Sequence, residues 1–204
     1  MKTLAILSRK GGTGKTTLAV HLSVAATLAG HTTVLIDLDP QASACKWSDI
    51  RQEDAPAAIS AHEARLPEVL HKAGQNGVDL AILDTPPKSD SFDTAEASDF
   101  ALIPCRPAIF DLQAIGSTMK IVKMADVPSS VVLNFVHPQS TMLIEARRAV
   151  KGYNTDCAPV TLGQRVAFSH ALIDGMSVQE FNANSKASSE INALYKYVAK
   201  QMEI

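Results

Sequence analysis

The sequence predicts an α/β fold in which a single doubly wound, mostly parallel sheet carries helices on both faces. Short apolar runs without polar alternation, such as residues 78–83 and 100–104, indicate strands that are buried on both sides. Segments with helical spacing separate these runs, as expected for parallel strands joined by helices. The composition is 46% hydrophobic but only 5% aromatic over 204 residues, which fits one aliphatic core and one domain spanning residues 1–204.

The expected elements follow in chain order. Residues 2–7 form the first strand, and the helix at 16–29 aligns Leu18 and Leu22 on one face before Gly30 ends it. Pro67 suits the first turn of a helix at 66–73. The other apolar runs predict strands at 33–36, 78–83, 100–104 and 130–135. The other helical spacings predict helices at 42–51, 112–124, 142–151 and 187–202.

A glycine-rich loop lies between the first strand and the first helix. A phosphate loop needs this context, because backbone N–H groups and the helix N-terminus bind phosphate oxygens. Lys15 is expected to reach the β- and γ-phosphates, and the Thr16 hydroxyl is expected to ligate Mg²⁺. The sequence therefore predicts a site for a nucleoside triphosphate with Mg²⁺. The expected binding residues are Lys10, Gly11, Gly12, Thr13, Gly14, Lys15, Thr16 and Thr17.

Acidic residues follow two of the predicted strands, at the sheet edge where α/β proteins bind ligands. Asp37 and Asp39 follow the strand at 33–36, and Asp84 follows the strand at 78–83. An apolar strand that ends in an aspartate is the usual form of a Walker B segment, so Asp84 is expected to hold the Mg²⁺ shell through water. Asp37 and Asp39 have an alternative, as turn or helix-capping carboxylates.

The phosphate loop departs from the general pattern, because Arg9 stands where the first glycine is expected and Lys10 follows it. This arrangement resembles the deviant Walker A box of the partition ATPases, the MinD cell-division ATPases and the nitrogenase iron protein. The segments Asp-x-Asp-Pro-Gln at 37–41 and Asp-Thr-Pro-Pro at 84–87 look like the partition ATPases. A fainter likeness at 165–180 is to their small ParF-like branch.

The resemblance implies an Mg²⁺-dependent ATPase that converts ATP to ADP, with Lys10, Lys15 and Asp39 as the catalytic residues. In the family, the lysine matching Lys10 crosses an ATP-dependent homodimer to the partner's phosphates. If Lys10 has no anionic partner in the monomer, the phosphates bound by the second subunit would provide one. The aspartate matching Asp37 supports the metal shell, and the one matching Asp39 positions the attacking water. Because no strong general base is evident, hydrolysis is expected to be slow.

Two further positions are interpreted through the resemblance. Asn134 falls where the family places an adenine-reading side chain, and its amide both donates and accepts hydrogen bonds. The alternative is an asparagine that makes a turn after a strand. Lys88 could face the dimer interface, although an ordinary surface lysine is the simpler interpretation.

The family function is segregation of plasmid or chromosome DNA. The resemblance implies a dimer that binds DNA without sequence preference, and a ParB-like centromere-binding adaptor that stimulates hydrolysis. A solvated helix face is the alternative for each basic cluster. The residues expected at DNA are Arg147, Arg148, Lys151, Arg165, Lys196 and Lys200.

The alternative function is that of a MinD-like or cargo-positioning ATPase acting on a membrane or on protein cargo. The tail at 195–204 is short and is expected to pack on the domain, so no membrane partner is expected. A net charge of −2 excludes a global attraction to nucleic acid. Three cysteines without paired spacing favour a reducing compartment, so a cytoplasmic protein is expected. The first strand starts at residue 2, so no signal peptide is expected. The resemblance implies association with the nucleoid.

Overall fold

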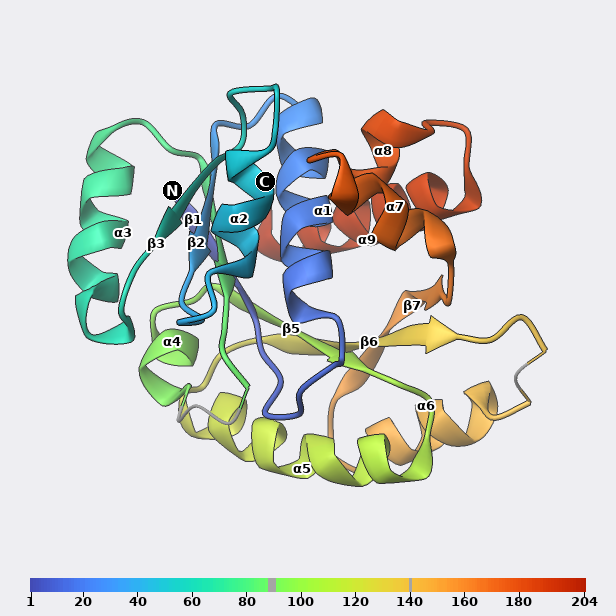
Figure 1. Ribbon diagram of the computed structural model, residues 1–204. Coiled ribbons are helices and arrows are strands. Elements are labelled where there is room, and N and C mark those ends of the chain that lie inside the picture. The colour runs from blue at the N-terminus through green and yellow to red at the C-terminus, as the bar shows by residue number, and fades with distance from the viewer. Residues whose placement is uncertain (88–90, 140) are drawn as a thin grey trace.

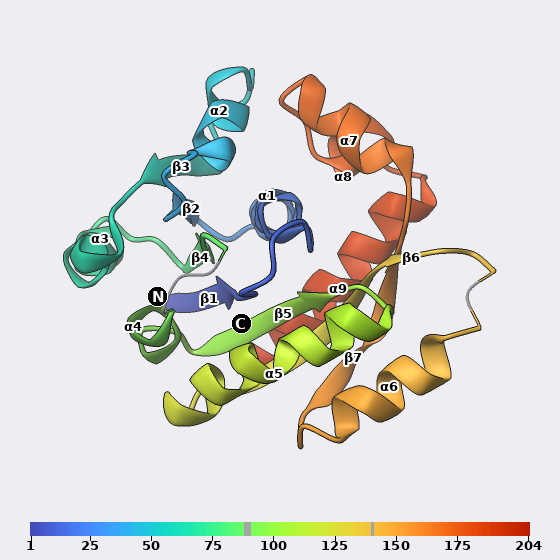
Figure 2. The same ribbon diagram turned by 60° about the horizontal axis from the view of Figure 1, so that its bottom comes forward.

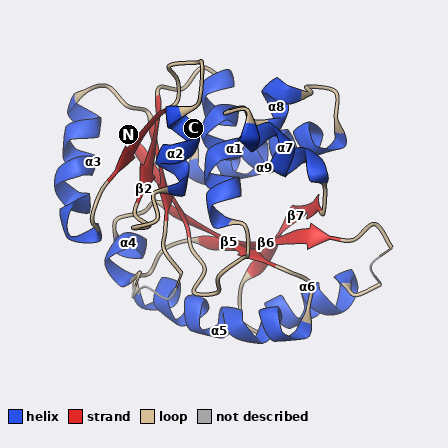
Figure 3. Cartoon of the chain, in the orientation of Figure 1, coloured by secondary structure: helices blue, strands red, loops and turns tan. Residues whose placement is uncertain are grey.

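The computed structural model describes residues 1–87, 91–139 and 141–204, and the sheet formed by this part of the chain has seven strands, all parallel (Figures 1 and 3). Their order is β3-β2-β4-β1-β5-β6-β7, so β1 lies where the winding of the sheet changes direction. In parallel sheets, ligands bind outside the carboxyl ends of the strands at this switch point. The strands are β1 (Lys2–Ile6), β2 (Thr33–Asp37), β3 (Ala57–Ser60), β4 (Leu80–Asp84), β5 (Phe100–Cys105), β6 (Ser129–Val136) and β7 (Asp156–Gly163).

Helices cover both faces of the sheet, each above its own apolar cluster (Figure 2). One face carries α1 (Lys15–Leu28), α2 (Ser43–Asp49), α7 (Val166–Ile173), α8 (Val178–Phe181) and α9 (Lys186–Met202). The opposite face carries α3 (Leu66–Gln75), α4 (Phe92–Glu96), α5 (Ile109–Met124) and α6 (Leu143–Lys151), and the 3₁₀ turn Glu63–Arg65 precedes α3. The predicted doubly wound fold is confirmed.

The structure confirms the five predicted strands and six predicted helices, with ends that shift by no more than three residues. It adds both edge strands, which the pattern missed for a physical reason. β3 is largely exposed, and β7 contains Pro159, which lacks the N–H that a central strand needs. Buried apolar runs therefore identified central strands but not edges. The short helices α4, α7 and α8 were also missed, since four to eight residues give little periodicity.

The C-terminal helix α9 packs on the sheet as predicted, and its Ile191 and Leu194 are fully buried. Among the residues that the structure describes, no helix has the length and apolar character needed to cross a bilayer. Lys88, which was considered for the dimer interface, lies outside the described residues.

His21 is a fully buried polar side chain in the core between α1 and α8. Its Nδ1 accepts a hydrogen bond from the Val178 N–H at 3.3 Å, and its ring lies 5.3 Å from that of Phe168. Nε2 has no hydrogen-bond partner within the described residues. Burial lowers the pKa of His21 from 6.5 to about 3, opposed only in part by Glu180. The histidine is therefore held neutral.

We expect this histidine to weaken the fold in mild acid. Its pKa is lower in the folded than in the unfolded chain, so the unfolded chain takes up the proton first as the pH falls below 6.5. Between pH 7 and 5 the wild type should lose ~2 kcal/mol of unfolding free energy from this residue. His21→Gln keeps an acceptor for Val178 and should flatten that slope in urea titrations. His71→Gln, at an exposed position on α3, should not; equal slopes for all three proteins would refute the assignment.

Candidate nucleotide site

The glycine-rich loop leaves β1 at the switch point and enters α1 at Lys15. Gly14 is the N-cap of α1 with φ +92°, and a Cβ on it would lie 2.5 Å from the Asn134 Nδ2. Glycine is therefore required there, both for the backbone conformation and for the close approach. No side chain caps the helix and its first turn holds no acidic residue. The N–H groups of that first turn are therefore available to phosphate oxygens.

Side chains hold the Lys10 and Thr13 carbonyl groups of this loop. The Lys10 carbonyl accepts from the Thr13 hydroxyl at 3.4 Å and from the Lys15 ammonium at 3.5 Å. The Thr13 carbonyl accepts from the Asn134 amide at 2.9 Å. Lys15 is 7% exposed, and burial lowers its pKa although Asp84 and Asp39 oppose the shift. Its amine therefore lies in the loop close to two carboxylates, ready for a stronger anionic partner.

Thr16 and Asp84 meet beneath the loop, where the Thr16 hydroxyl donates to the Asp84 Oδ2 at 2.6 Å. Asp84 is 1% exposed, and its Oδ1 has no hydrogen-bond partner within the residues described. Burial, followed by nearby Asp37, raises the pKa of Asp84 to about 7 against the Thr16 hydrogen bond. A buried carboxylate with an unused oxygen next to a hydroxyl suits a divalent cation.

The residues present fit Mg²⁺ better than a metal held by many protein ligands. In the described ranges, no three His, Cys, Asp or Glu side chains gather as a metal cluster. Mg²⁺ keeps several waters and takes one or two protein oxygens together with substrate phosphates. Thr16 and Asp84 supply such a set at the start of α1 and the end of β4. Mg²⁺ binding by Thr16 and Asp84 remains a prediction, and the short distance between their oxygens agrees with it.

Asp37 and Asp39 occupy the end of β2 and the loop after it, and both make turn contacts. Asp37 is directly paired in register with Asp84, which explains its effect on that carboxyl. Its Oδ1 accepts from the Asp39 N–H, and its Oδ2 accepts from the N–H groups of Ala44 and Cys45 at the start of α2. Asp37 therefore orders the loop that carries Asp39. These contacts are those of the capping alternative for Asp37. The metal role of Asp37 and the water-positioning role of Asp39 remain predictions.

Lys10 has a partner inside the monomer, which corrects the expectation of an unpaired cation. Its ammonium lies 2.7 Å from the Asp111 Oδ2, with the lysine side chain 37% and the aspartate side chain 10% exposed. Asp111 comes from the first turn of α5, beyond β5, a segment distant in sequence. A negative charge is favourable in the first turn of a helix, so Asp111 is stable there. Because α5 begins beside the phosphate loop, the Asp111 carboxylate reaches Lys10.

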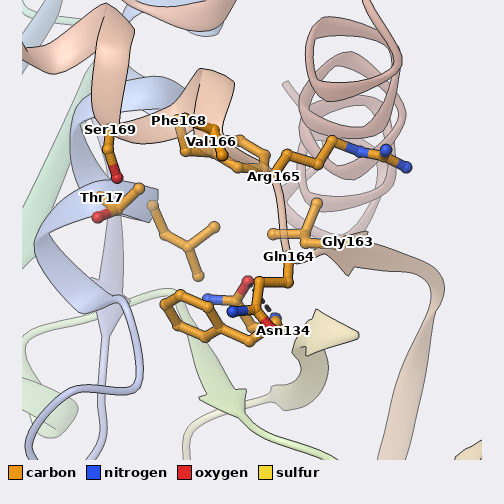
Figure 4. Close-up of a pocket in the computed structure, with 11 residues that line it drawn as sticks. Thr17, Asn134, Gly163, Gln164, Arg165, Val166, Phe168 and Ser169 are labelled. Atoms are coloured by element: carbon orange, nitrogen blue, oxygen red, sulfur yellow. Dashed lines mark hydrogen bonds between the residues drawn. The ribbon is translucent and has the colours of Figure 1, made fainter. Parts of the chain in front are cut away.

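A cavity of about 230 Å³ opens beside the phosphate loop, between α1, α7 and the ends of β6 and β7 (Figure 4). Thr17 and Ser169 lie on one side of it, and Asn134 and Gln164 lie on the other. The Asn134 Nδ2 donates to the Thr13 carbonyl and its Oδ1 accepts from the Phe135 N–H, which leaves one donor and one acceptor for a base. Sequence reasoning found Thr17 and Asn134 but missed lining residues from β6, from α7 and from the segment between β7 and α7. The missed lining residues are Phe135, Gln164, Val166, Phe168 and Ser169.

The basic residues predicted at DNA do not form one group. Arg148 and Lys151 are exposed on α6, while Arg147 donates to the carbonyls of Ala158 and Pro159 at 3.2 Å. Exposed Lys196 and Lys200 lie on α9, on the opposite face of the sheet. Both helices contact β7, so the two groups flank the same sheet edge.

Arg165 differs from the other predicted DNA residues. Its guanidinium forms two hydrogen bonds with Glu190 of α9, at 3.0 and 2.5 Å, and points away from the cavity (Figure 4). Glu190 also accepts from the Gly163 N–H. The Arg165–Glu190 pair therefore connects α9 to the rim of the cavity. Because Glu190 already neutralises the charge of Arg165, this arginine is a poor candidate for a DNA contact.

Comparison of the sequence with known protein families identifies the family of this chain. A family profile described as the CobQ/CobB/MinD/ParA nucleotide binding domain matches residues 4–178, which include the loop, both acidic segments and the cavity. The chain belongs to this family. It is therefore a ParA/MinD-type P-loop ATPase, and the resemblance drawn from the deviant phosphate loop is confirmed.

Individual relatives extend along nearly the whole chain. The chain is 32% identical over 216 residues to the maintenance of carboxysome distribution protein A of Gloeobacter kilaueensis, covering 99% of this chain and 94% of the relative. The protein of the same name from Halothiobacillus neapolitanus is 28% identical over 207 residues, covering 96% and 95%. The fold matches the septum site-determining protein MinD of Pyrococcus horikoshii, solved with Mg-ADP, at TM-score 0.78 and 18% identity over 98% of this chain and 96% of that one.

Proposed function

We propose that this ParA/MinD-type ATPase is an ATP-driven switch that distributes a cargo, through a nucleotide-dependent dimer that binds DNA without sequence preference. The observation that carries the proposal is the phosphate loop with its two lysines, one enclosed in the loop and one at its exposed mouth. Lys15 is buried, whereas Lys10 is only half-buried. In this proposal Lys15 serves the chain's own nucleotide, and Lys10 serves the nucleotide of an approaching subunit.

Each part of the site has a share in ATP hydrolysis. Lys15 and the N–H groups of the loop bind and orient the phosphates, and Thr16 with Asp84 would hold Mg²⁺. When bound, Mg²⁺ supplies positive charge that neutralises the phosphates. Asp39 lies two residues after the end of β2, whose Asp37 pairs with Asp84 in the sheet, and we assign it the orientation of the attacking water. A carboxylate is a weak base, which supports slow turnover suited to a timer.

Dimerisation gives the switch its output. Lys10 exchanges Asp111 for the phosphates bound by the partner subunit, so a stable dimer forms only with ATP present. Hydrolysis removes that contact and releases the subunits. A cargo-bound adaptor, ParB-like or of another kind, stimulates hydrolysis where the cargo lies, so that the ATPase is depleted locally from the nucleoid.

A protein assembly is the cargo that the relatives favour. Two relatives named for carboxysome distribution cover almost all of the chain, at 28% and 32% identity. Segregation of plasmid or chromosome DNA is the second candidate, favoured by the two-lysine loop that resembles the partition ATPases. A membrane-bound role is less favoured, because the apolar face of α9 is buried against the sheet.

The DNA part of the proposal predicts a strong dependence on charge and salt. Two copies of a weak basic surface in one dimer raise affinity by roughly 10² or more through avidity. Arg147→Glu with Arg148→Glu should reduce ATP-dependent DNA binding by at least about tenfold at low salt, since phosphate contacts dominate non-specific affinity. Fluorescence anisotropy with ATP and Mg²⁺ over a salt series measures this.

The matched control reverses two exposed charges elsewhere, with Arg65→Glu in the 3₁₀ turn before α3 and Lys72→Glu on α3. That variant should bind DNA like the wild type. Equal DNA affinities for the α6 variant and the wild type would remove α6 from the DNA surface and leave Lys196 and Lys200 as the remaining candidates.

The two cargo candidates are separated in cells. Deleting the gene should leave plasmids stably inherited but should cluster a large protein body if the cargo is a protein assembly. Plasmid loss with normally dispersed protein bodies would instead support DNA segregation. Imaging of tagged bodies and plasmid-retention counts in the same strain give both readouts.

A further inference from the structure

Arg106 is a cation at the mouth of the phosphate loop that neither the motif nor the family likeness singled out. It directly follows β5 and is exposed. Its Nη2 donates to the Gly12 carbonyl at 2.6 Å, and its guanidinium lies 4.5 Å from the centroid of the Phe135 ring. One side chain therefore joins the ends of β5 and β6 to the middle of the loop.

The backbone of Phe135 is held in an unfavourable conformation at this place. Its φ is +55°, in the left-handed region that bulky residues rarely adopt. The Asn134 Oδ1 accepts from the Phe135 N–H, which fixes the turn. The Phe135 ring packs closely on the loop, since one ring carbon lies 3.2 Å from where a Cβ of Gly14 would be. The strained turn thus puts one aromatic ring against both the Gly14 end of the loop and the Arg106 guanidinium.

The hydrogen bond to Gly12 controls the direction of a donor. A peptide carbonyl and the N–H of the following residue share one plane and point in opposite directions. Holding the Gly12 carbonyl toward Arg106 therefore turns the Thr13 N–H to the other side of the loop. The same logic applies to the Thr13 carbonyl, which Asn134 holds at 2.9 Å. Arg106, directly after β5, and Asn134 of β6 thus hold two successive peptides of the loop.

We propose that Arg106 is a positioning residue for nucleotide binding, which fixes the Gly12–Thr13 peptide so that the Thr13 N–H faces the phosphates. The proposal rests on the nucleotide chemistry proposed above. Arg106 acts through the loop backbone and not on the reacting atoms. Its removal should weaken binding of ATP and ADP alike while turnover at saturating ATP stays close to normal.

The test compares Arg106→Met, which keeps the stem but loses every donor, with the wild type. Calorimetric titration should give a Kd for MgADP and for MgATP that is raised about tenfold, the worth of one charge-assisted hydrogen bond. The kcat at saturating ATP should stay within about threefold of the wild type, because the lost interaction stabilises the bound substrate and the transition state equally. In the MgADP complex, hydrogen exchange at the Thr13 amide should become faster.

Two further variants complete the design. Arg106→Lys can donate to Gly12 but cannot spread over the Phe135 ring, so its Kd should fall between those of Arg106→Met and the wild type. Arg65→Met removes an exposed arginine beside α3 and should bind both nucleotides normally. Should Arg106→Met fail to fold, an intermediate Kd for Arg106→Lys still supports the role, and a wild-type Kd overturns it.

Failure of this inference differs from failure of the proposed function. A wild type that binds neither MgADP nor MgATP would overturn the nucleotide site itself. A wild type that binds them and an Arg106→Met variant with unchanged Kd, or with lowered kcat alone, would overturn only the role of Arg106.

Discussion

Asp84→Asn is expected to make the ligand-free protein more stable at pH 8 while it removes nucleotide hydrolysis. Burial raises the pKa of Asp84 to about 7, above its ordinary value of 3.8. A raised pKa in the folded state contributes stability that is complete below about pH 4 and is lost as the pH rises through 7. At pH 8 the folded protein therefore carries a buried carboxylate whose Oδ1 has no partner within the described residues.

The expected gain in stability is large for a substitution at a functional position. Asparagine keeps an oxygen that can accept from the Thr16 hydroxyl and removes the buried charge. We expect a gain of roughly 2 kcal/mol at pH 8, or about 4–8 °C in Tm for a chain of this size. At pH 5 the wild-type carboxyl is protonated, so most of the difference should vanish. Calorimetric scans at both pH values, without nucleotide or Mg²⁺, measure it.

The same substitution should lower ATP turnover by about 100-fold or more, because a neutral amide cannot hold Mg²⁺ against water. Asp54→Asn, at an exposed position, should change neither stability nor turnover. A destabilised Asp84→Asn at pH 8, or one that hydrolyses ATP at the wild-type rate, would contradict the role assigned to Asp84. A gain in stability that accompanies a loss of activity is the signature of a carboxylate kept for function.

Asp111→Asn is expected to strengthen the ATP-dependent dimer. The Asp111 carboxylate holds Lys10 at 2.7 Å in the monomer, and this pair must break before Lys10 reaches the partner's phosphates. Asparagine retains a polar side chain of the same shape but gives up the ionic attraction. The dimer dissociation constant should fall roughly five- to thirtyfold, because each of the two protomers breaks one partly exposed pair worth about 0.5–1 kcal/mol. Sedimentation with ATP and Mg²⁺ measures this constant.

Variants of Lys10 and of Asp111 should change the dimer in opposite directions. Lys10→Ala should bind ATP but stay monomeric, since it lacks the crossing cation. Combining Lys10→Ala with Asp111→Asn should give a monomer as well, because Asp111 acts only through Lys10. Asp93→Asn, at an exposed position in the first turn of α4, is the matched control and should leave the dimer unchanged. A weaker dimer for Asp111→Asn would mean that this carboxylate supports the dimer and does not restrain Lys10.

The sequence determined those parts of the molecule whose residues are neighbours along the chain. The phosphate loop, the Walker B aspartate and the central strands are short contiguous patterns, so their chemistry was readable before any fold was known. The family followed from the same stretch, because Lys10 and the glycines after it are adjacent. The central strands were predicted because they are buried on both faces, while the edge strands β3 and β7 lack that pattern.

Only the tertiary structure decided what joins distant segments at the sheet edge. The pairing of Lys10 with Asp111, the bond from Arg106 to Gly12 and the bond from Asn134 to Thr13 each bring together residues about a hundred positions apart. No local pattern encodes such a contact, because the carboxyl ends of β1, β5 and β6 become neighbours only through the strand order. The chain therefore specifies its phosphate chemistry locally, and the parallel sheet determines which side chains hold and restrain it.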